Sequence, residues 1–181
     1  RSRLRVGTRL SRGEALRLAL MSSENRAAHA LARTFPGGMD DFVRRMNLKA
    51  QQVGAVHASF VDPTGLSNAN RASARDVAAL VTAAAGYPQI RTHSTTSSHQ
   101  ARLGGQRLTY LNSNRLVRHD RWQMQVQKTG YIVEAGFCLA TTMQVAGRRV
   151  ALVLLDAGSR GQRDEDARRL RRALEARPAG R

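Results

Sequence analysis

The stretch Gln123-Met124-Gln125-Val126-Gln127-Lys128 alternates between polar and apolar side chains. Because successive side chains of a strand point to opposite faces, this pattern predicts a strand with one solvated face. Two more apolar runs follow, at about 137–145 and 149–155, and Ala146-Gly147 between them suits a hairpin turn. We therefore expect three consecutive strands that pair as an antiparallel sheet.

Upstream of these strands the apolar residues recur at helical spacing. Ser11-Arg12-Gly13-Glu14 has the capping-box pattern, in which Glu14 reaches back to the Ser11 amide, and it starts a helix that Ser22-Ser23 interrupts. Further helices are predicted from Glu24 to about Arg33, over 39–53, from Ser73 to about 85, and over about 163–176. The stretch from Gln89 to about Arg121 is polar and is expected to be irregular, with a turn at Gly104-Gly105.

The order of these elements is typical of an α+β domain with helices packed on an antiparallel sheet, and not of a doubly wound fold. With 181 residues, 41% of them hydrophobic, the chain suits a single domain over residues 1–181. No apolar run approaches the roughly 20 residues of a membrane-spanning helix, and the sequence leaves peripheral membrane association open. A lone cysteine, Cys138, excludes an internal disulfide framework and a multi-cysteine zinc site.

The charge is strongly basic, since 30 Lys and Arg against 13 Asp and Glu give a formal net charge of +17. A basic domain is the usual footprint of a nucleic-acid-binding protein, which is therefore one hypothesis for the function. Aromatic residues for base stacking make up only 4%, and the arginines are dispersed apart from a cluster within 168–172. Only Lys49 and Lys128 are lysines, and a lysine amine can lose its proton whereas an arginine guanidinium cannot.

Two short motifs indicate chemistry. Ser23-Glu24-Asn25 lies at the break between the first two predicted helices, and Lys128-Thr129-Gly130 ends the alternating strand. Motifs of this kind, together with Ser-x-x-Lys, form the set found in penicillin-binding proteins and serine β-lactamases. A helix cap explains Ser23 alone and a solvated strand end explains Lys128 alone, but the two motifs together favour a catalytic site.

The sequence resembles the D-alanyl-D-alanine carboxypeptidase/endopeptidase family, the low-molecular-weight penicillin-binding proteins, from about Leu4 to Leu174. The resemblance rests on four stretches in the family's order: Met21-Ser22-Ser23-Glu24-Asn25-Arg26-Ala27-Ala28, Phe60-Val61-Asp62-Pro63-Thr64-Gly65-Leu66, Ser73-Ala74-Arg75-Asp76 and Lys128-Thr129-Gly130. The first stretch is most similar to the D-alanyl-D-alanine endopeptidase branch, the penicillin-binding protein seven type. The resemblance implies the fold of penicillin-binding proteins and serine β-lactamases.

The resemblance also implies a function and a place in the cell. The enzyme would be a serine-type D-Ala-D-Ala carboxypeptidase or endopeptidase that cleaves peptidoglycan stem peptides during cell wall remodelling. It would be exported to the periplasm, would use no cofactor and no metal, and in its complete form would be inhibited by β-lactam antibiotics. No nucleic-acid partner is expected from it.

Roles for single residues follow from the same resemblance. Ser23 and Lys128 would pass a proton to the leaving amine, and Asn25 would hold the substrate amide and the lysine partner of the nucleophile. For substrate binding, the Thr129 hydroxyl would donate to the substrate carboxylate, and Gly130 would permit close approach of the substrate to the strand. The Tyr131 amide would be an oxyanion-hole donor, and Arg163 would be a carboxylate-binding arginine.

One family motif is absent from these 181 residues. The family nucleophile is the serine of Ser-x-x-Lys, but Met46 lies three residues before Lys49 and Gln125 lies three residues before Lys128. In the family this motif precedes Ser-x-Asn by tens of residues, so we expect it upstream of Arg1. The 181 residues would then be an incomplete catalytic domain, inactive alone. A non-catalytic relative that only binds cell-wall polymer is a further hypothesis.

Overall fold

The three-stranded sheet that the sequence predicts is present in the computed structural model, which describes residues 2–118 and 122–176. Strands β3 (Met124–Ile132), β4 (Gly136–Val145) and β5 (Arg148–Ala157) pair antiparallel in the order β3-β4-β5. Ala146 and Gly147, both at positive φ, make the turn between β4 and β5. The predicted fold class, α+β with helices packed on an antiparallel sheet, is confirmed.

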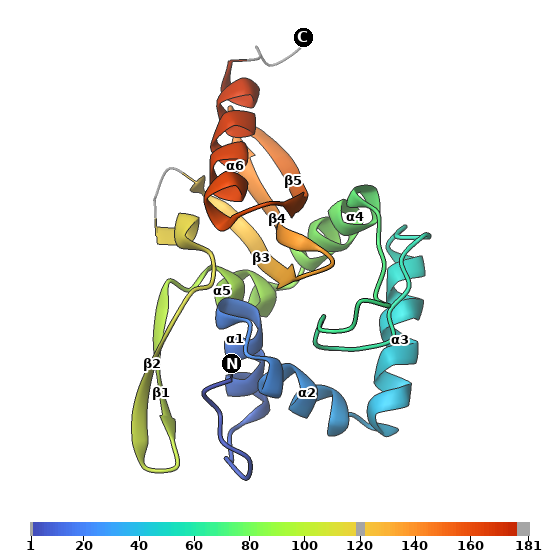
Figure 1. The fold of residues 1–181 in the computed structure, drawn as a ribbon, viewed down its shortest axis with the longest axis vertical. Coiled ribbons are helices and arrows are strands. Elements are labelled where there is room, and N and C mark those ends of the chain that lie inside the picture. The colour runs from blue at the N-terminus through green and yellow to red at the C-terminus, as the bar shows by residue number, and fades with distance from the viewer. Residues whose placement is uncertain (1, 119–121, 177–181) are drawn as a thin grey trace.

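Helices cover both faces of this sheet (Figure 1). The α-helices of the described ranges are α1 (Arg12–Ser22), α2 (Asn25–Arg33), α3 (Gly38–Gln52), α4 (Ala74–Ala84), α5 (Pro88–Thr95) and α6 (Arg160–Glu175). Helix α6 packs its Ala167 against Leu139 of β4 on one face, and α4 packs its Val81 against Val126 of β3 on the other. In Figure 1 the sheet and α6 form the upper part of the molecule, and α1, α2 and α3 form the lower part.

The solvated face predicted for the first strand is present only at its start, where Gln123 is exposed and Gln125 is half-buried. Gln127, on the predicted polar face, has no exposed surface. Its Nε2 donates to the Ser94 carbonyl of α5 at 2.5 Å and to Asn112 Oδ1 at 2.9 Å. At Gln127 the prediction of a solvated side chain is therefore wrong, because hydrogen-bonding partners from distant segments replace water there.

The stretch from Gln89 to Arg121 is also more regular than the sequence predicts. It contains most of α5, a hairpin of β1 (Ser98–Leu103) and β2 (Gln106–Leu111), and a 3₁₀ helix, η1 (Arg115–Arg118). The expected turn at Gly104-Gly105 joins β1 to β2, and both glycines have positive φ. His119 and the rest of 119–121 lie outside the described residues.

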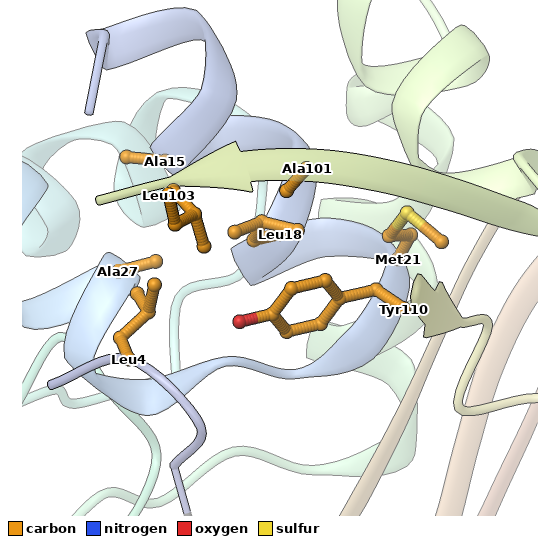
Figure 2. Packing of buried hydrophobic residues seen from close by; sticks show 8 residues of the cluster. All are labelled: Leu4, Ala15, Leu18, Met21, Ala27, Ala101, Leu103 and Tyr110. Atoms are coloured by element: carbon orange, nitrogen blue, oxygen red, sulfur yellow. The ribbon is translucent and has the colours of Figure 1, made fainter. Parts of the chain in front are cut away.

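The hairpin is held by packing on α1. Figure 2 shows Leu103 and Tyr110 of the hairpin beside Leu18 and Met21 of α1, in one buried cluster. The cluster also contains Leu4, Ala15, Ala27 and Ala101. Few apolar residues in the hairpin face this core, so the local sequence carries only a weak strand signal.

The start of α6 and the partner of Glu14 in α1 depart from expectation. Helix α6 begins at Arg160 and not at 163, because the Ser159 side chain accepts a hydrogen bond from the Gln162 amide and caps it. Ser11 caps α1 as predicted, but the Glu14 carboxylate lies 2.8 Å from His99 Nε2 of β1, where the sequence predicts a bond to the Ser11 amide. Within residues 2–118 and 122–176, no helix combines the length and the apolar character that crossing a bilayer requires.

Candidate active site

Ser23 and Asn25 lie where one helix ends and the next begins. Ser23 is the C-cap of α1, with a left-handed backbone at φ 55° and ψ 43°. A left-handed residue ends a helix and turns the chain, and few residues other than glycine and asparagine adopt it readily. Glu24 caps α2 by accepting from the Arg26 amide, and it also accepts from the Arg3 amide at 3.1 Å. The junction is therefore fixed from both sides, with Ser23 and Asn25 on one cleft.

Lys128 reaches this junction from β3. Its Nζ donates to Ser23 Oγ, and also to the Thr129 carbonyl oxygen at 2.6 Å. Burial of the ammonium, which removes it from water, lowers the pKa of Lys128 from 10.5 to about 8. Near neutral pH this amine can therefore both hold and release a proton, as a residue that passes protons must.

Ser113 is a site residue that the sequence patterns did not single out. Ser23 Oγ donates to Ser113 Oγ at 3.4 Å, and Ser113 Oγ lies 2.7 Å from Thr129 Oγ1. Ser113 stands between two asparagines in the connection from β2 to η1. A polar triplet between two elements is the ordinary composition of a loop, so only the three-dimensional structure identifies it.

All the sequence-predicted site residues line one cleft of about 730 Å³. The cleft runs between the α1–α2 junction, the end of β3 and the start of α6. The predicted residues along it are Ser23, Asn25, Lys128, Thr129, Gly130, Tyr131 and Arg163. Ser113, Phe137, Arg160 and the loop from Thr64 to Leu66 also line it.

Gly130 and Tyr131 form the open end of the cleft on β3. A Cβ atom built on Gly130 would lie 3.7 Å from Cys138 Cβ, which is an ordinary contact, so packing within the sheet does not require a glycine here. The lack of a side chain instead leaves the strand open toward the cleft. Tyr131 is 55% exposed, and its ring lies 4.3 Å from the Phe137 ring, centroid to centroid.

Arg163 reaches the cleft as a buried ion pair. It is 2% exposed, and its Nε and Nη2 donate to Asp164 Oδ1 at 2.9 and 2.6 Å. Its charge is therefore already matched by a carboxylate, whereas Arg160, one turn earlier on α6, lines the cleft as an exposed side chain. In the described part of the chain, no three His, Cys, Asp or Glu side chains gather into a possible metal site.

A Ser-x-Asn helix junction that faces the Lys-Thr-Gly end of a strand across one cleft defines the class of penicillin-binding proteins and serine β-lactamases. The family model described as D-alanyl-D-alanine carboxypeptidase, Peptidase_S11, matches residues 1–159. The chain belongs to this family.

Curated relatives agree with this membership. The D-alanyl-D-alanine endopeptidase of Pseudomonas aeruginosa is 44% identical over 176 residues, and that of Escherichia coli K12 is 43% identical over 176 residues. Each match covers 96% of this chain and 57% of the relative, so the chain spans little more than half the length of these proteins.

Solved structures share the fold. The Streptomyces K15 DD-transpeptidase superimposes with a TM-score of 0.87 at 24% identity, covering 97% of this chain and 71% of that one. Penicillin-binding protein D2 from Listeria monocytogenes, in its cefotaxime-bound form, gives a TM-score of 0.79 at 23% identity, covering 93% of this chain and 67% of that one. At these identities the likeness concerns the fold.

Proposed function

We propose that these residues form part of a serine-type D-alanyl-D-alanine endopeptidase or carboxypeptidase that acts on peptidoglycan stem peptides. The observation that carries the proposal is the contact of Lys128 with Ser23 across a cleft that opens on Thr129-Gly130. Family membership supports the reaction class, and the curated endopeptidases support the choice of substrate. Such an enzyme would act on the cell wall after export to the periplasm.

In this mechanism the nucleophile is the serine of a Ser-x-x-Lys segment, supplied from outside these 181 residues. It attacks the carbonyl carbon of the D-alanyl residue while its hydroxyl proton passes to the lysine of the same Ser-x-x-Lys segment, and the oxyanion that forms accepts a hydrogen bond from the Tyr131 amide. The C–N bond then breaks, and the leaving amine receives a proton through Ser23 from Lys128. Water hydrolyses the resulting acyl-enzyme and releases the shortened peptide.

The cleft also offers groups that bind and orient the substrate. The Thr129 hydroxyl and the Arg163 guanidinium would donate to the substrate carboxylate. The exposed Arg160 would add the positive charge, because Asp164 already balances that of Arg163. Asn25 would hold the substrate amide from the helix side. The Listeria relative is solved with cefotaxime bound, which supports β-lactams as inhibitors of the complete enzyme at this same cleft.

Both the family membership and the distribution of charge argue against the nucleic-acid-binding hypothesis. Arginines of the 168–172 cluster are engaged on α6 itself: Arg168 and Arg172 contact Glu165, and Arg171 contacts Glu175. Family membership favours the peptidase.

The test is penicillin labelling of a polypeptide that joins these 181 residues to a Ser-x-x-Lys segment of the family. We expect a fluorescent penicillin to label it covalently, and unlabelled penicillin to prevent the labelling. Release of D-alanine from pentapeptides would indicate a carboxypeptidase, and conversion of cross-linked muropeptide dimers to monomers would indicate an endopeptidase. Binding of muropeptides without labelling or cleavage would instead support the non-catalytic relative.

A further inference from the structure

Four polar groups form a continuous row across the cleft. Lys128 Nζ contacts Ser23 Oγ, Ser23 Oγ contacts Ser113 Oγ, and Ser113 Oγ contacts Thr129 Oγ1. The two ends of this row are the residues to which the proposed function gives proton transfer and carboxylate binding. Ser113, in the middle, has no role in the mechanism above.

The backbone holds Ser113 in place from both sides. Its amide donates to the Met21 carbonyl of α1 at 2.8 Å. The neighbouring Asn112 is buried, and its Nδ2 donates to the carbonyls of Ser94 and Thr96, both at 2.8 Å. Because these bonds are made in a buried site, the position of the Ser113 hydroxyl between helix and strand is determined by the fold and not by a mobile loop.

We propose that Ser113 is a positioning residue that fixes the direction of hydrogen bonding along this row, and so couples the proton on Lys128 to the free hydroxyl proton of Thr129. The proposal rests on the proposed function for the roles of the two ends. Each hydroxyl in the row has one proton to donate. When the Lys128 ammonium donates to Ser23, Ser23 donates to Ser113, Ser113 donates to Thr129, and Thr129 keeps its proton for a carboxylate in the cleft.

Loss of the proton from Lys128 permits the opposite direction. A neutral amine has a lone pair that accepts the Ser23 proton, which leaves Ser23 Oγ to accept from Ser113 and Ser113 Oγ to accept from Thr129. The Thr129 proton is then bound to Ser113 and is not available to a carboxylate in the cleft. By linkage, a bound carboxylate that uses the Thr129 proton also favours the protonated form of Lys128.

Other charged groups around Lys128 do not account for its proton affinity. Those of the cleft are Arg160 and the Arg163–Asp164 pair on α6, and those near it are Glu24 at the start of α2 and Asp62 in the loop before Thr64. The lowered pKa of Lys128 arises from burial. A change in the hydrogen bonding of the hydroxyls in this row is therefore expected to change the proton affinity of the Lys128 amine.

The first test is the pKa of Lys128 in the full-length protein without ligand, followed by NMR of lysine side chains. The Lys128 signal is assigned with Lys128→Arg, and Lys49 is an internal control. Ser113→Ala removes the acceptor that the Ser23 proton has when Lys128 is protonated, whereas the neutral Lys128 amine can still accept that proton. The variant should therefore favour the neutral amine and lower the pKa of Lys128 from about 8 to roughly 7.5, the size expected of one hydrogen bond. Ser113→Thr, which keeps the hydroxyl, should retain the parent value.

A matched control is Ser22→Ala, since the Ser22 hydroxyl donates to the Leu18 carbonyl at 2.8 Å and lies outside the row. It should leave the pKa of Lys128 unchanged, and thermal unfolding should show that all variants fold. A Ser113→Ala pKa equal to or above that of the parent overturns the proposal. If Ser113→Ala does not fold, the comparison of Ser113→Thr with Ser113→Val decides in the same way.

The second test is the affinity for an acetylated D-Ala-D-Ala peptide with a free carboxylate, between about pH 6.5 and 9.5. Affinity of the parent should fall as Lys128 loses its proton. At pH 6.5, where Lys128 is protonated in both proteins, Ser113→Ala should bind about as well as the parent. At pH 9.5 it should bind about 3- to 10-fold more tightly than the parent, because Thr129 no longer has Ser113 to donate to, so its affinity should fall less with pH. Identical profiles for the two overturn the coupling. No binding by the parent at any pH contradicts the proposed function instead, and the pKa measurement still decides the role of Ser113.

Discussion

At the scale of the residue, Lys128 combines a chemical advantage with a cost in stability. It is one of two lysines among 30 basic residues, and burial lowers its pKa to about 8. Arginine at this position would keep the charge and would stay protonated at any physiological pH. An amine that titrates near neutral pH is therefore available here because the residue is a lysine and because it is removed from water.

Lys128→Arg in a polypeptide that carries Ser-x-x-Lys should separate proton transfer from charge. If Lys128 passes a proton, we expect acylation by a β-lactam and by a D-Ala-D-Ala peptide to slow by about 10²- to 10⁴-fold. The matched control is Lys49→Arg, because Lys49 lies on α3 and its Nζ is 5.8 Å from the Tyr87 ring centre, outside the cleft. Similar rates for both variants and the parent would mean that Lys128 only steers the carboxylate.

Lys128→Met should raise the free energy of unfolding at pH 7 by about 1–2 kcal/mol. The folded-state pKa of about 8 lies below the ordinary 10.5, so the unfolded chain binds the proton more tightly between these values. Stability of the parent therefore rises with pH from about 8 to 10.5, and the advantage of the variant should shrink over this window. Chemical denaturation at pH 7, 8.5 and 10 measures the free energy of unfolding of both proteins. If the difference between them does not change with pH, burial is not what lowers the pKa of Lys128.

At the scale of the element, the sequence predicts those helices and strands that carry local signals. Helix α4 is an example, because Ser73 Oγ accepts from the Asp76 amide and Asp76 accepts from the Ser73 amide, as the capping-box spacing indicates. Strands β3, β4 and β5 likewise follow from apolar periodicity and from the Ala146-Gly147 turn. Elements that are stabilised mainly by residues distant in the chain have no such local signal in their own sequence.

The β1–β2 hairpin and Ser113 illustrate what the sequence could not provide. The hairpin is ordered by packing Leu103 and Tyr110 on α1, more than 80 residues away in the chain (Figure 2). Ser113 joins the site because its amide bonds to Met21 and its hydroxyl to Thr129. By contrast, Ser23 and Lys128 could be predicted, because their motifs have specific residue types at fixed spacing.

Asn112→Ala tests how the connection before η1 is held. The variant removes all four bonds of the buried Asn112 side chain, to the Ser94 and Thr96 carbonyls, the Asn114 amide and Gln127 Nε2. Gln127 and Ser94 still bond to each other, but the Thr96 carbonyl and the Asn114 amide lose these partners, which should lower the free energy of unfolding by about 2–4 kcal/mol. The control, Asn68→Ala, removes only an exposed 3.5 Å contact with Glu134 and should change stability by less than about 0.5 kcal/mol. Equal effects of the two would show that the buried bonds do not hold this connection.

At the scale of the whole molecule, the cleft joins segments that are far apart in the chain. Ser23 comes from the α1–α2 junction, Ser113 from a connection, Lys128 from β3 and Arg163 from α6. The sheet fixes Lys128 and the helical part fixes Ser23, so a change in their relative position alters the contact between them (Figure 1). The site is therefore a property of the assembled fold.

These 181 residues alone should form no covalent adduct with a fluorescent penicillin. They contain no Ser-x-x-Lys, and in the proposed mechanism the Tyr131 amide supplies only one of the two oxyanion donors. Ser23 does have an amine beside it, since Lys128 contacts its hydroxyl, so it is a candidate for a substitute nucleophile in this cleft. Its hydroxyl, however, is placed between Lys128 and Ser113 as a link in a hydrogen-bonded row.

Intact mass spectrometry after incubation with penicillin measures whether an adduct forms, with the polypeptide that includes Ser-x-x-Lys as the positive control. An adduct on the 181 residues that maps to Ser23, and that Ser23→Ala abolishes, would show instead that the Ser23–Lys128 pair is a nucleophile and its base.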